Sequence, residues 1–460
     1  MIGGIISDPM ATSQLSSHRI FHTWWPLAAS WLLMGVELPA ISAVIARLAN
    51  PEISLAAYGG IIFPLALIIE SPIVMLLAAS TALSKDWASF VKIRRFMIIA
   101  GISLTLFHIL IAFTPLYYVI VERLLGVPQE IVEPARVGLM IMTPWSMAIA
   151  YRRFHQGMLI RFGHSRAVST GTMIRLSADL LVLGIGYALH TVPGIIVATS
   201  AVAAGVVSEA IYAGIIALPV IKHELIPAAP IPIPLTLRKF LSFYFPLVLT
   251  SLISLLVQPI GSAALSRMSQ PIESLATWSV VSGLVFMLRS FGIAYNEVVV
   301  ALLDELQAAK KLWSFAKKLL LIMTGIWLLI VATPFSRFWF QTVSALPNDL
   351  VVLAQIGIWI TLPMPALAVL QSWYQGAILH SHKTKGITEA VVVFLLVNIA
   401  TLVFGVMWGK VTGLYIGLAS FVLSTFIQTV WLWYRSQHAI NVVHERDELE
   451  ISIPPAEIVS

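Results

Sequence analysis

Long apolar stretches separated by short polar segments run along almost the whole chain. Twelve of these stretches reach about 20 residues, the length that an α-helix needs to cross the hydrocarbon core of a bilayer. They cover residues 24–46, 57–82, 96–121, 136–158, 168–190, 194–220, 240–265, 276–302, 313–333, 350–373, 387–408 and 411–434. The pattern predicts an all-α integral membrane protein with twelve transmembrane helices and with both termini on one side.

The second half of the sequence is a diverged repeat of the first half. Trp25-Pro26-Leu27 is matched 220 residues later by Phe245-Pro246-Leu247, and the run from Arg47 to Ala56 by the run from Arg267 to Ala276. Further on the offset is 219, and it pairs Gly138 with Gly357, Pro144 with Pro363, Gln156 with Gln375, Asp179 with Asn398, Gly194 with Gly413 and Glu209 with Gln428. Two parallel six-helix repeats are an architecture of transporters whose bundles move about a central site.

The repeat and the polar segments predict four regions. Residues 1–222 form an N-terminal six-helix lobe and residues 238–436 a C-terminal one. The linker 223–237 contains four prolines and favours an extended, polyproline-like strap. The tail 437–460 is polar and acidic, and we expect it to be disordered.

The distribution of charge gives the orientation. Apolar residues make up 58% of the chain and charged residues 11%, against about 25% charged in a soluble domain. Of the 28 Lys and Arg, 18 fall on one set of alternate loops and tails and six on the other set. This bias places the linker and both termini in the cytoplasm. The net charge of +6 is therefore a signal of topology, and no nucleic-acid partner is expected.

Few kinds of chemistry fit the motifs of the chain. It has no cysteine, no phosphate-binding loop and no metal-spaced histidine pair in a span. We therefore expect no enzyme activity, no bound metal and no cofactor. The informative residues are ionisable groups at membrane depth, where one charge costs about 3 kcal/mol and needs a partner, water or a function.

Four acidic residues inside spans are candidates for binding a coupling ion, either H⁺ or Na⁺. They are Glu37, Glu70, Asp179 and Glu209. An alternative for Asp179 is an ion pair with Arg175, four residues earlier on the same helix face. Because the second half has Asn398 and Gln428 at the places of Asp179 and Glu209, ion coupling is predicted to belong to the N-terminal half.

The buried arginines are candidates for binding an anion, because the guanidinium group offers a fork of donors suited to carboxylate or phosphate. The substrate-binding candidates are Arg289, Arg152, Arg153, Arg175, Asn296 and Glu297. The alternative for Arg289 is an ion pair with Glu70 or Glu297. Pro39 and Pro259, at equivalent places in the first and seventh spans, are candidate hinges.

Two motifs resemble those of the MATE-type exporters, whose superfamily includes the lipid-linked oligosaccharide flippases. One is Arg47-Leu48 followed by Leu55-Ala56-Ala57-Tyr58-Gly59, and the other is Gln156-Gly157-Met158-Leu159-Ile160-Arg161, with its echo Gln375-Gly376-Ala377-Ile378-Leu379. The third span and the start of the seventh are most similar to the progressive ankylosis (ANK) branch, through Phe107 to Phe113, Leu116-Tyr117-Tyr118-Val119-Ile120 and Phe243-Tyr244-Phe245-Pro246-Leu247.

The resemblance implies a MATE-like fold, and for the ANK branch the export of pyrophosphate, nucleotide and citrate-like anions. Drug-exporting MATE proteins usually carry an acidic residue six positions before the Arg-Leu motif. This chain has Ile41 there, and Glu37 lies one turn earlier on the same helix face.

The sequence thus predicts a monomeric secondary transporter of the inner (plasma) membrane that exports a small organic or phosphate-type anion by alternating access. One alternative is a flippase for a lipid-linked substrate, and another is a multidrug or organic-cation antiporter. A membrane scaffold or receptor that transports nothing is a further alternative, against which the charges within the spans argue.

Overall fold

The computed structural model describes residues 15–232, 234–305, 307–381 and 385–452, which are helical almost throughout and form no strand. The first half contains α1 (Ser17–Ile45), α2 (Pro51–Leu55), the π-helical segment η1 (Ala56–Ile62), α3 (Phe63–Val74), α4 (Leu76–Leu83), α5 (Trp87–Phe113), α6 (Leu116–Tyr118), η2 (Val119–Leu124), α7 (Gln129–Ile141), α8 (Trp145–Arg161), α9 (Ser165–Leu189), α10 (Gly194–Val220) and η3 (Ile221–Leu225). The second half contains α11 (Leu237–Leu265), α12 (Pro271–Leu302), α13 (Ala308–Ala332), α14 (Phe335–Phe338), η4 (Trp339–Val343), α15 (Asn348–Ile360), α16 (Met364–His380), α17 (Lys385–Trp408) and α18 (Gly413–Ser452).

The internal repeat is confirmed by details of the backbone. Asn50 and Gln270 both adopt left-handed conformations, with φ of 51° and 53°, directly before the prolines that begin α2 and α12. The short α6 and η2 of the first half correspond to α14 and η4 of the second, and the break between α7 and α8 corresponds to that between α15 and α16. The two halves therefore share irregular features as well as helices.

Ten helices among the described residues are long and apolar enough to cross a membrane. The count is eleven if α15 and α16, which are bent by 42°, form one span. The predicted fourth span does not qualify, because α7 and α8 break near Pro144 and carry Arg136, Arg152 and Arg153. Twelve transmembrane helices remain a prediction.

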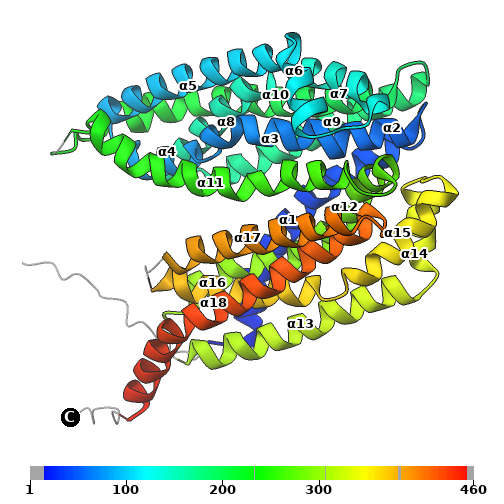
Figure 1. Cartoon of the computed structure of the whole chain (residues 1–460). Helices are drawn as coiled ribbons and strands as arrows, with labels where there is room; N and C mark the ends of the chain where they lie inside the picture. The colour runs from blue at the N-terminus through cyan, green and yellow to red at the C-terminus, as the bar shows by residue number, and fades with distance from the viewer. Residues whose placement is uncertain (1–14, 233, 306, 382–384, 453–460) are drawn as a thin grey trace, which may run out of the picture.

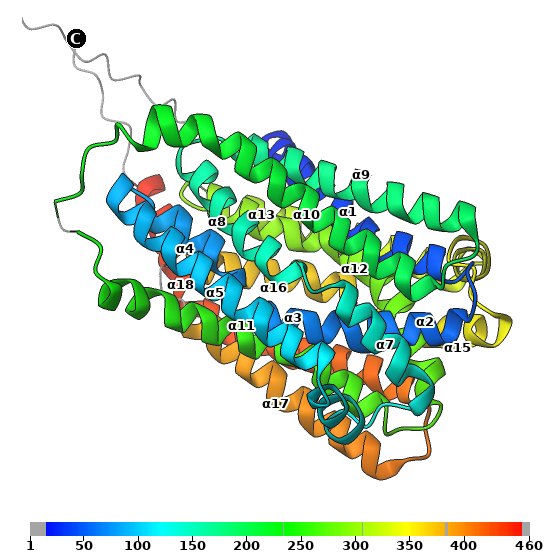
Figure 2. The same ribbon diagram turned by 90° about the horizontal axis from the view of Figure 1, so that it is seen from above.

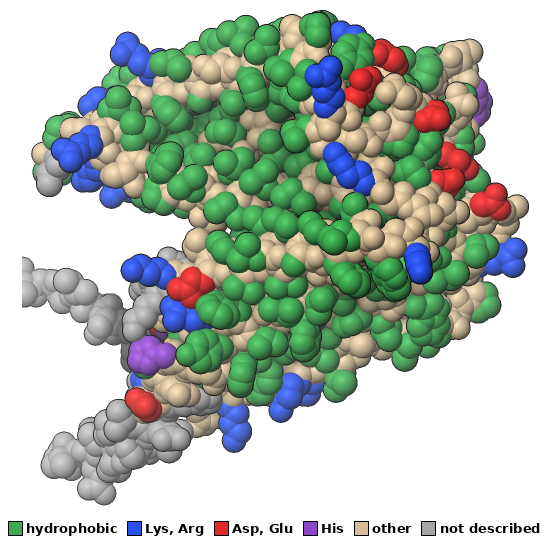
Figure 3. Space-filling model, viewed as in Figure 1, with side chains coloured by type: hydrophobic (Ala, Val, Ile, Leu, Met, Phe, Trp, Pro, Cys, Tyr) green, Lys and Arg blue, Asp and Glu red, His purple; other side chains and the backbone are tan. Residues whose placement is uncertain are grey.

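The helices form two bodies that converge at one end and separate at the other (Figure 1). We call the end that carries the α4–α5 turn, the linker after η3 and the α12–α13 turn the linker face. We call the opposite end, with the α1–α2 and α11–α12 turns, the far face. The space-filling view shows the molecule hollowed between the two bodies at the linker face (Figure 3).

The first helix of each half bridges the two bodies. The linker-face part of α1 packs on α12, where Trp24 donates to the carbonyl oxygen of Phe291 at 2.9 Å. In the same way, α11 packs on α3, where Tyr244 donates to the carbonyl oxygen of Pro72 at 2.6 Å. The view from above shows α1 and α11 lying on different sides of the assembly (Figure 2). In each half, the start of the first helix thus packs against helices of the other half.

The second part of the linker is held to the first half by two hydrogen bonds. Asp86 caps α5 by accepting from the amide of Ser89 at 3.0 Å, and its second oxygen accepts from the amide of Ile231 at 3.4 Å. Lys92 donates to the carbonyl oxygen of Leu235 at 2.7 Å. Burial acts to raise the pKa of the Asp86 carboxyl, but the hydrogen bonds from Ser89 and Ile231 outweigh it and hold the pKa below its ordinary value.

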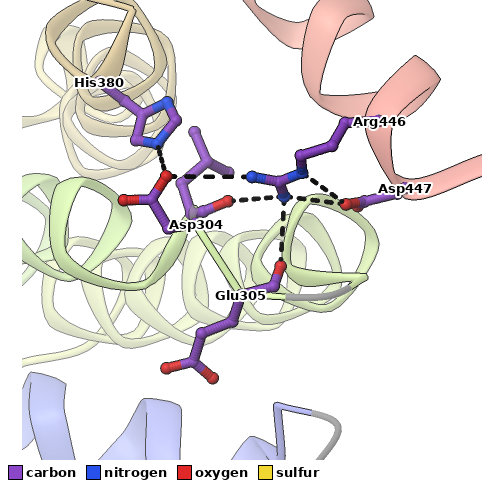
Figure 4. Close-up of polar contacts among 6 residues, drawn as sticks. Asp304, Glu305, His380, Arg446 and Asp447 are labelled. Atoms are coloured by element: carbon purple, nitrogen blue, oxygen red, sulfur yellow. Dashed lines mark hydrogen bonds and ion pairs between the residues drawn. The ribbon is translucent and has the colours of Figure 1, made fainter. Parts of the chain in front are cut away.

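The prediction of a disordered tail from residue 437 is wrong for its described part, because α18 continues to Ser452. Charge pairing fastens this extension to the α12–α13 turn (Figure 4). Arg446 donates to Asp447 at 2.8 Å and to the carbonyl oxygens of Leu303 and Glu305 at 3.1 and 3.3 Å. Asp304 lies 3.9 Å from Arg446 and 2.6 Å from His380 at the end of α16. The rest of the predicted tail, 453–460, lies outside the described residues.

Candidate functional site

A buried ionic cluster lies where α1, α8, α9 and α10 of the first half meet. Its centre is Glu209 of α10, which is 1% exposed. Arg152 and Gln156, one turn apart on α8, both bind this carboxylate. Arg152 forms an ion pair with it, and the Gln156 amide donates to its other oxygen at 2.9 Å. Both oxygens of Glu209 are therefore held by α8.

Arg175 of α9 joins two more helices to the cluster. Its guanidinium lies 2.8 Å from the carboxylate of Glu37 on α1 and 3.5 Å from that of Glu209. The predicted alternative of an Arg175–Asp179 ion pair is not what the structure shows. Arg175 instead contacts the carboxylates of Glu37 and Glu209 on neighbouring helices. Its buried positive charge and their two negative charges therefore compensate one another.

Asp179 is the least satisfied member of the cluster. Its side chain is 2% exposed, and neither carboxylate oxygen accepts a hydrogen bond from a donor group of the described residues. The charges of Glu37 and Asp179 act on each other, and two neighbouring carboxylates disfavour the ionisation of both. The fit depends on Gly205 of α10, because a Cβ there would lie 1.8 Å from Asp179 Oδ1.

Glu37 and Asp179 also line a cavity of about 230 Å³ between α1 and α9, whose other walls are mostly apolar. The cluster contains three carboxylates and two arginines, so full ionisation would leave one negative charge without a protein partner. A cluster of this kind can hold one proton or one small cation.

The second half repeats this arrangement with neutral groups. Gln371 and Gln428, the equivalents of Arg152 and Glu209, form an amide–amide hydrogen bond of 2.9 Å. Asn398, the equivalent of Asp179, donates to Ser420 at 3.0 Å. Val257 stands in the place of Glu37, and the cavity beside it is only about 30 Å³. The same backbone scaffold therefore holds charge in one half and amides in the other.

Glu70 lies apart from this cluster. The indole of Trp145, at the start of α8, donates to its carboxylate. The irregular backbone before Pro72 is satisfied locally, because Ser71 donates to the carbonyl oxygen of Ile68 at 2.9 Å. Glu70 forms no ion pair among the described residues.

Two arginines of the interior, Arg153 and Arg289, form neither an ion pair nor a hydrogen bond with the described residues. The Nε atom of each is buried without an acceptor. Arg289 lies over the ring of Phe421, 5.3 Å from its centroid, in a cation–π contact that leaves the N–H donors free. The alternative pairing of Arg289 with Glu70 or Glu297 does not occur in the structure.

The remaining predicted residues lie elsewhere. Asn296 donates to the carbonyl oxygen of Ser372 at 3.2 Å, and Trp31 donates to Glu297 at 3.2 Å. Pro39 packs against Gly283 of α12. Pro259 is buried within α11, and the structure assigns no motion to either proline.

Sequence reasoning missed Gln156 and Trp145, which orient Glu209 and Glu70. A signal for Gln156 was present, since it follows Arg152 by one helical turn and recurs as Gln375 in the repeat. The bond from Trp145 joins two helices that no local pattern connects.

Solved structures of transporters have a similar fold. The inward-facing conformation of a multidrug resistance MATE family transporter of the MOP superfamily has a TM-score of 0.70 and 14% identity, covering 91% of this chain and 99% of that one. The lipid II flippase MurJ, in an inward closed conformation, has a TM-score of 0.66 and 17% identity, covering 94% of each chain. An outward-facing conformation of a MATE family transporter has a TM-score of 0.57 and 15% identity over 93% of this chain and 96% of that one. These likenesses show that the chain has the fold of the MATE family transporters.

A comparison of the sequence with models of protein families shows the family of this chain. The family model described as "Progressive ankylosis protein (ANKH)" matches residues 20–287, more than half of the chain. The chain belongs to the progressive ankylosis protein family. No curated protein matches it in sequence. The resemblance found in the third and seventh spans is thereby confirmed.

Proposed function

We propose that this transporter exports a small organic or phosphate-type anion, by alternating access between its two halves and at the expense of an H⁺ or Na⁺ gradient. The observation that carries this proposal is the pair of interior arginines, Arg153 and Arg289, neither of which forms an ion pair with a described residue. A buried arginine without a partner is costly, and an anionic substrate would supply the missing charge.

Arg289 is the principal anion-binding residue in this proposal. Its contact with the ring of Phe421 does not use its N–H groups, which remain available to carboxylate or phosphate oxygens. Arg153 is the second anion-binding residue. Arg152 and Arg175, which were candidates for the same role, are engaged by Glu209 and Glu37 and serve the ionic cluster instead.

The coupling ion would bind in that cluster. Glu37 and Asp179 share the place where one negative charge lacks a protein partner, and the cavity between α1 and α9 offers a path to it. Glu209 and Glu70 are held by hydrogen bonds, and they would shape the site without carrying the ion.

The transport cycle follows from the charge bias and the shape. With 18 of 28 basic residues on its loops and tails, the linker face is the cytoplasmic one in this proposal, and α1 begins and α18 ends on that side. The hollow between the bodies then opens to the cytoplasm and would receive the substrate. Closing it while the far face opens would release the substrate outside. In this proposal the protein is a monomer of the plasma membrane, with twelve spans in two halves joined by the linker.

The test is uptake of labelled pyrophosphate and citrate into proteoliposomes under an imposed proton or sodium gradient. Gradient-dependent flux is expected, and Arg289→Ala should reduce it at least ten-fold. Arg123→Ala removes an exposed arginine at the far face and serves as the matched control.

A transporter of lipid-linked or cationic substrates would move neither anion, although folded protein is present. If flux occurs but both Arg289→Ala and Glu37→Gln leave it unchanged, the proposed substrate and coupling sites are wrong.

A further inference from the structure

A second polar cavity lies in the other half of the molecule, between α1, α12 and α16. Its volume is about 180 Å³. The polar part of its lining comes from Trp31, Asn296, Glu297, Gln371, Ser372 and Gln375. Among the residues that line it there is one carboxylate and neither Lys, Arg nor His. Its chemistry therefore differs from that of the first-half cluster, which contains two arginines.

The hydrogen bonds at this cavity use amide nitrogens and leave amide oxygens as acceptors. The amide nitrogen of Asn296 is used by the carbonyl oxygen of Ser372 at 3.2 Å, and that of Gln371 by the side-chain oxygen of Gln428 at 2.9 Å. An amide whose nitrogen donates elsewhere leaves its oxygen as an acceptor. Asn296 and Gln371 thus each offer one carbonyl-type oxygen whose orientation is fixed by the protein.

Glu297 supplies the charge. The indole nitrogen of Trp31 donates to its Oε1 atom at 3.2 Å, which fixes the carboxylate and leaves Oε2 free. One carboxylate with neutral amide oxygens carries a single negative charge, which matches a monovalent cation. Hard cations without d-electron preferences bind oxygen ligands, and divalent ones usually require several carboxylates. No cluster of three acidic or histidine side chains suited to such a metal occurs among the described residues.

The repeat supports the assignment independently. At the places of Asn296 and Glu297, the first half has Leu77 and Ala78, and at the place of Gln371 it has Arg152. The oxygen-rich cavity is therefore not inherited from the shared scaffold. Its amide and carboxylate oxygens come from the second half alone, whereas the cluster with Glu37 and Asp179 is in the first half.

We propose that this cavity binds one sodium ion through the side-chain oxygens of Glu297, Asn296 and Gln371, with Trp31 positioning the carboxylate. The site goes beyond the proposed anion transport and does not depend on it. Bound sodium would join α12 to α16, and Trp31 would connect α1 to the site through Glu297.

The test is equilibrium binding of ²²Na⁺ to the purified full-length protein in choline-based buffer without other alkali ions. Saturable binding is expected, and Glu297→Gln should weaken it about ten-fold or more. Glu273→Gln, on the same helix at the far face, is the matched control and should bind as the wild type does. Thermal unfolding without sodium shows that each variant is folded.

Three results would overturn the proposal. One is the absence of saturable sodium binding to folded wild-type protein. Another is binding that survives Glu297→Gln but is lost in Asp179→Asn, which would place the ion in the first half. The third is displacement of sodium by Ca²⁺ at lower concentration than by K⁺, which would mean a divalent site. Because this assay measures no transport, its outcome is separate from that of the anion-flux experiment.

Discussion

Arg47 and Arg267 make the same contact in opposite directions across the far face. Arg47, after α1, donates to the carbonyl oxygens of Thr342 and Val343 in the second half, at 2.6 and 2.9 Å. Arg267, after α11, donates to those of Leu124 and Leu125 in the first half, at 2.7 and 2.6 Å. Each arginine thus binds carbonyl groups at the end of a π-helical segment of the other half, and together they fasten the far face.

These two contacts should oppose opening of the far face. Hydrogen bonds to a charged donor contribute about 1.5–3 kcal/mol when buried, and less where they are exposed as here. In the variant with Arg47→Ala and Arg267→Ala, the population open at the far face should rise about ten-fold. Because the chain has no cysteine, spin labels at Glu130→Cys and Asp349→Cys can report the distance without background. An unchanged distance distribution in the double variant, compared with Arg123→Ala, would show that the arginines do not fasten this face.

A close helix contact on the same side predicts a second effect. A Cβ on Gly59 of η1 would lie 2.2 Å from the Cβ of Ser279 on α12. Gly59→Ala should therefore push η1 and α12 apart and destabilise the protein by about 1–3 kcal/mol. Adding Ser279→Gly should restore much of the loss. Gly184→Ala, where no atom lies within 4 Å of the added Cβ, is the control. Thermal unfolding is measured for the wild type, Gly59→Ala, the double variant and Gly184→Ala. If Ser279→Gly does not restore stability to Gly59→Ala, this account is wrong.

The amide pair of the second half shows how the ionic cluster can be neutralised. Glu209→Gln alone leaves Arg152 buried without its carboxylate and should cost about 3–5 kcal/mol of stability. Adding Arg152→Gln reproduces the Gln371–Gln428 pair and should recover most of it. Under the proposed coupling, the double variant should still lose gradient-driven flux. The thermal midpoint and proteoliposome flux measure the two effects separately, and a double variant as unstable as Glu209→Gln would argue against the equivalence of the pairs.

The attachment of the linker to Asp86 should depend on pH. The pKa of this carboxyl is lowered in the folded protein from an ordinary value of 3.8, so its hydrogen bonds stabilise the fold above that value and are lost as the pH falls below it. Hydrogen exchange at the Ile231 amide, corrected for intrinsic rate, should lose protection below about pH 3.8. Asp86→Ala should lack this protection already at pH 6. Equal protection in both proteins at pH 6 would rule out the attachment.

Much of the fold follows from the sequence, since the length and apolarity of a stretch suffice to predict a membrane helix. The ends of the helices do not follow as well. α1 begins at Ser17, before the apolar stretch, because Ser16 caps a turn that contains His18 and Arg19. α18 runs past its apolar part because Arg446 anchors it to another turn. Both extensions depend on polar contacts that hydropathy does not report.

The members of the site were predictable, but their pairing was not. Charges at membrane depth single out Glu37, Arg175 and Asp179. Spacing on one helix favours an Arg175–Asp179 pair, whereas the fold brings Glu37 of α1 beside Arg175. Contacts between helices depend on the tertiary packing, which the spacing of residues on one helix does not report. The amide pair of the second half, by contrast, could have been inferred by carrying the repeat offset from Arg152 to Gln371.

The bridging of both bodies by α1 and α11 has a consequence for the origin of this molecule. If a six-helix ancestor already had this packing, two separate copies would have exchanged their first helices, as in a domain-swapped homodimer. Fusion of the duplicated genes then turned that exchange into a contact within one polypeptide. Freed from the need to be identical, one subunit could keep its acids and arginines while the other replaced them with amides.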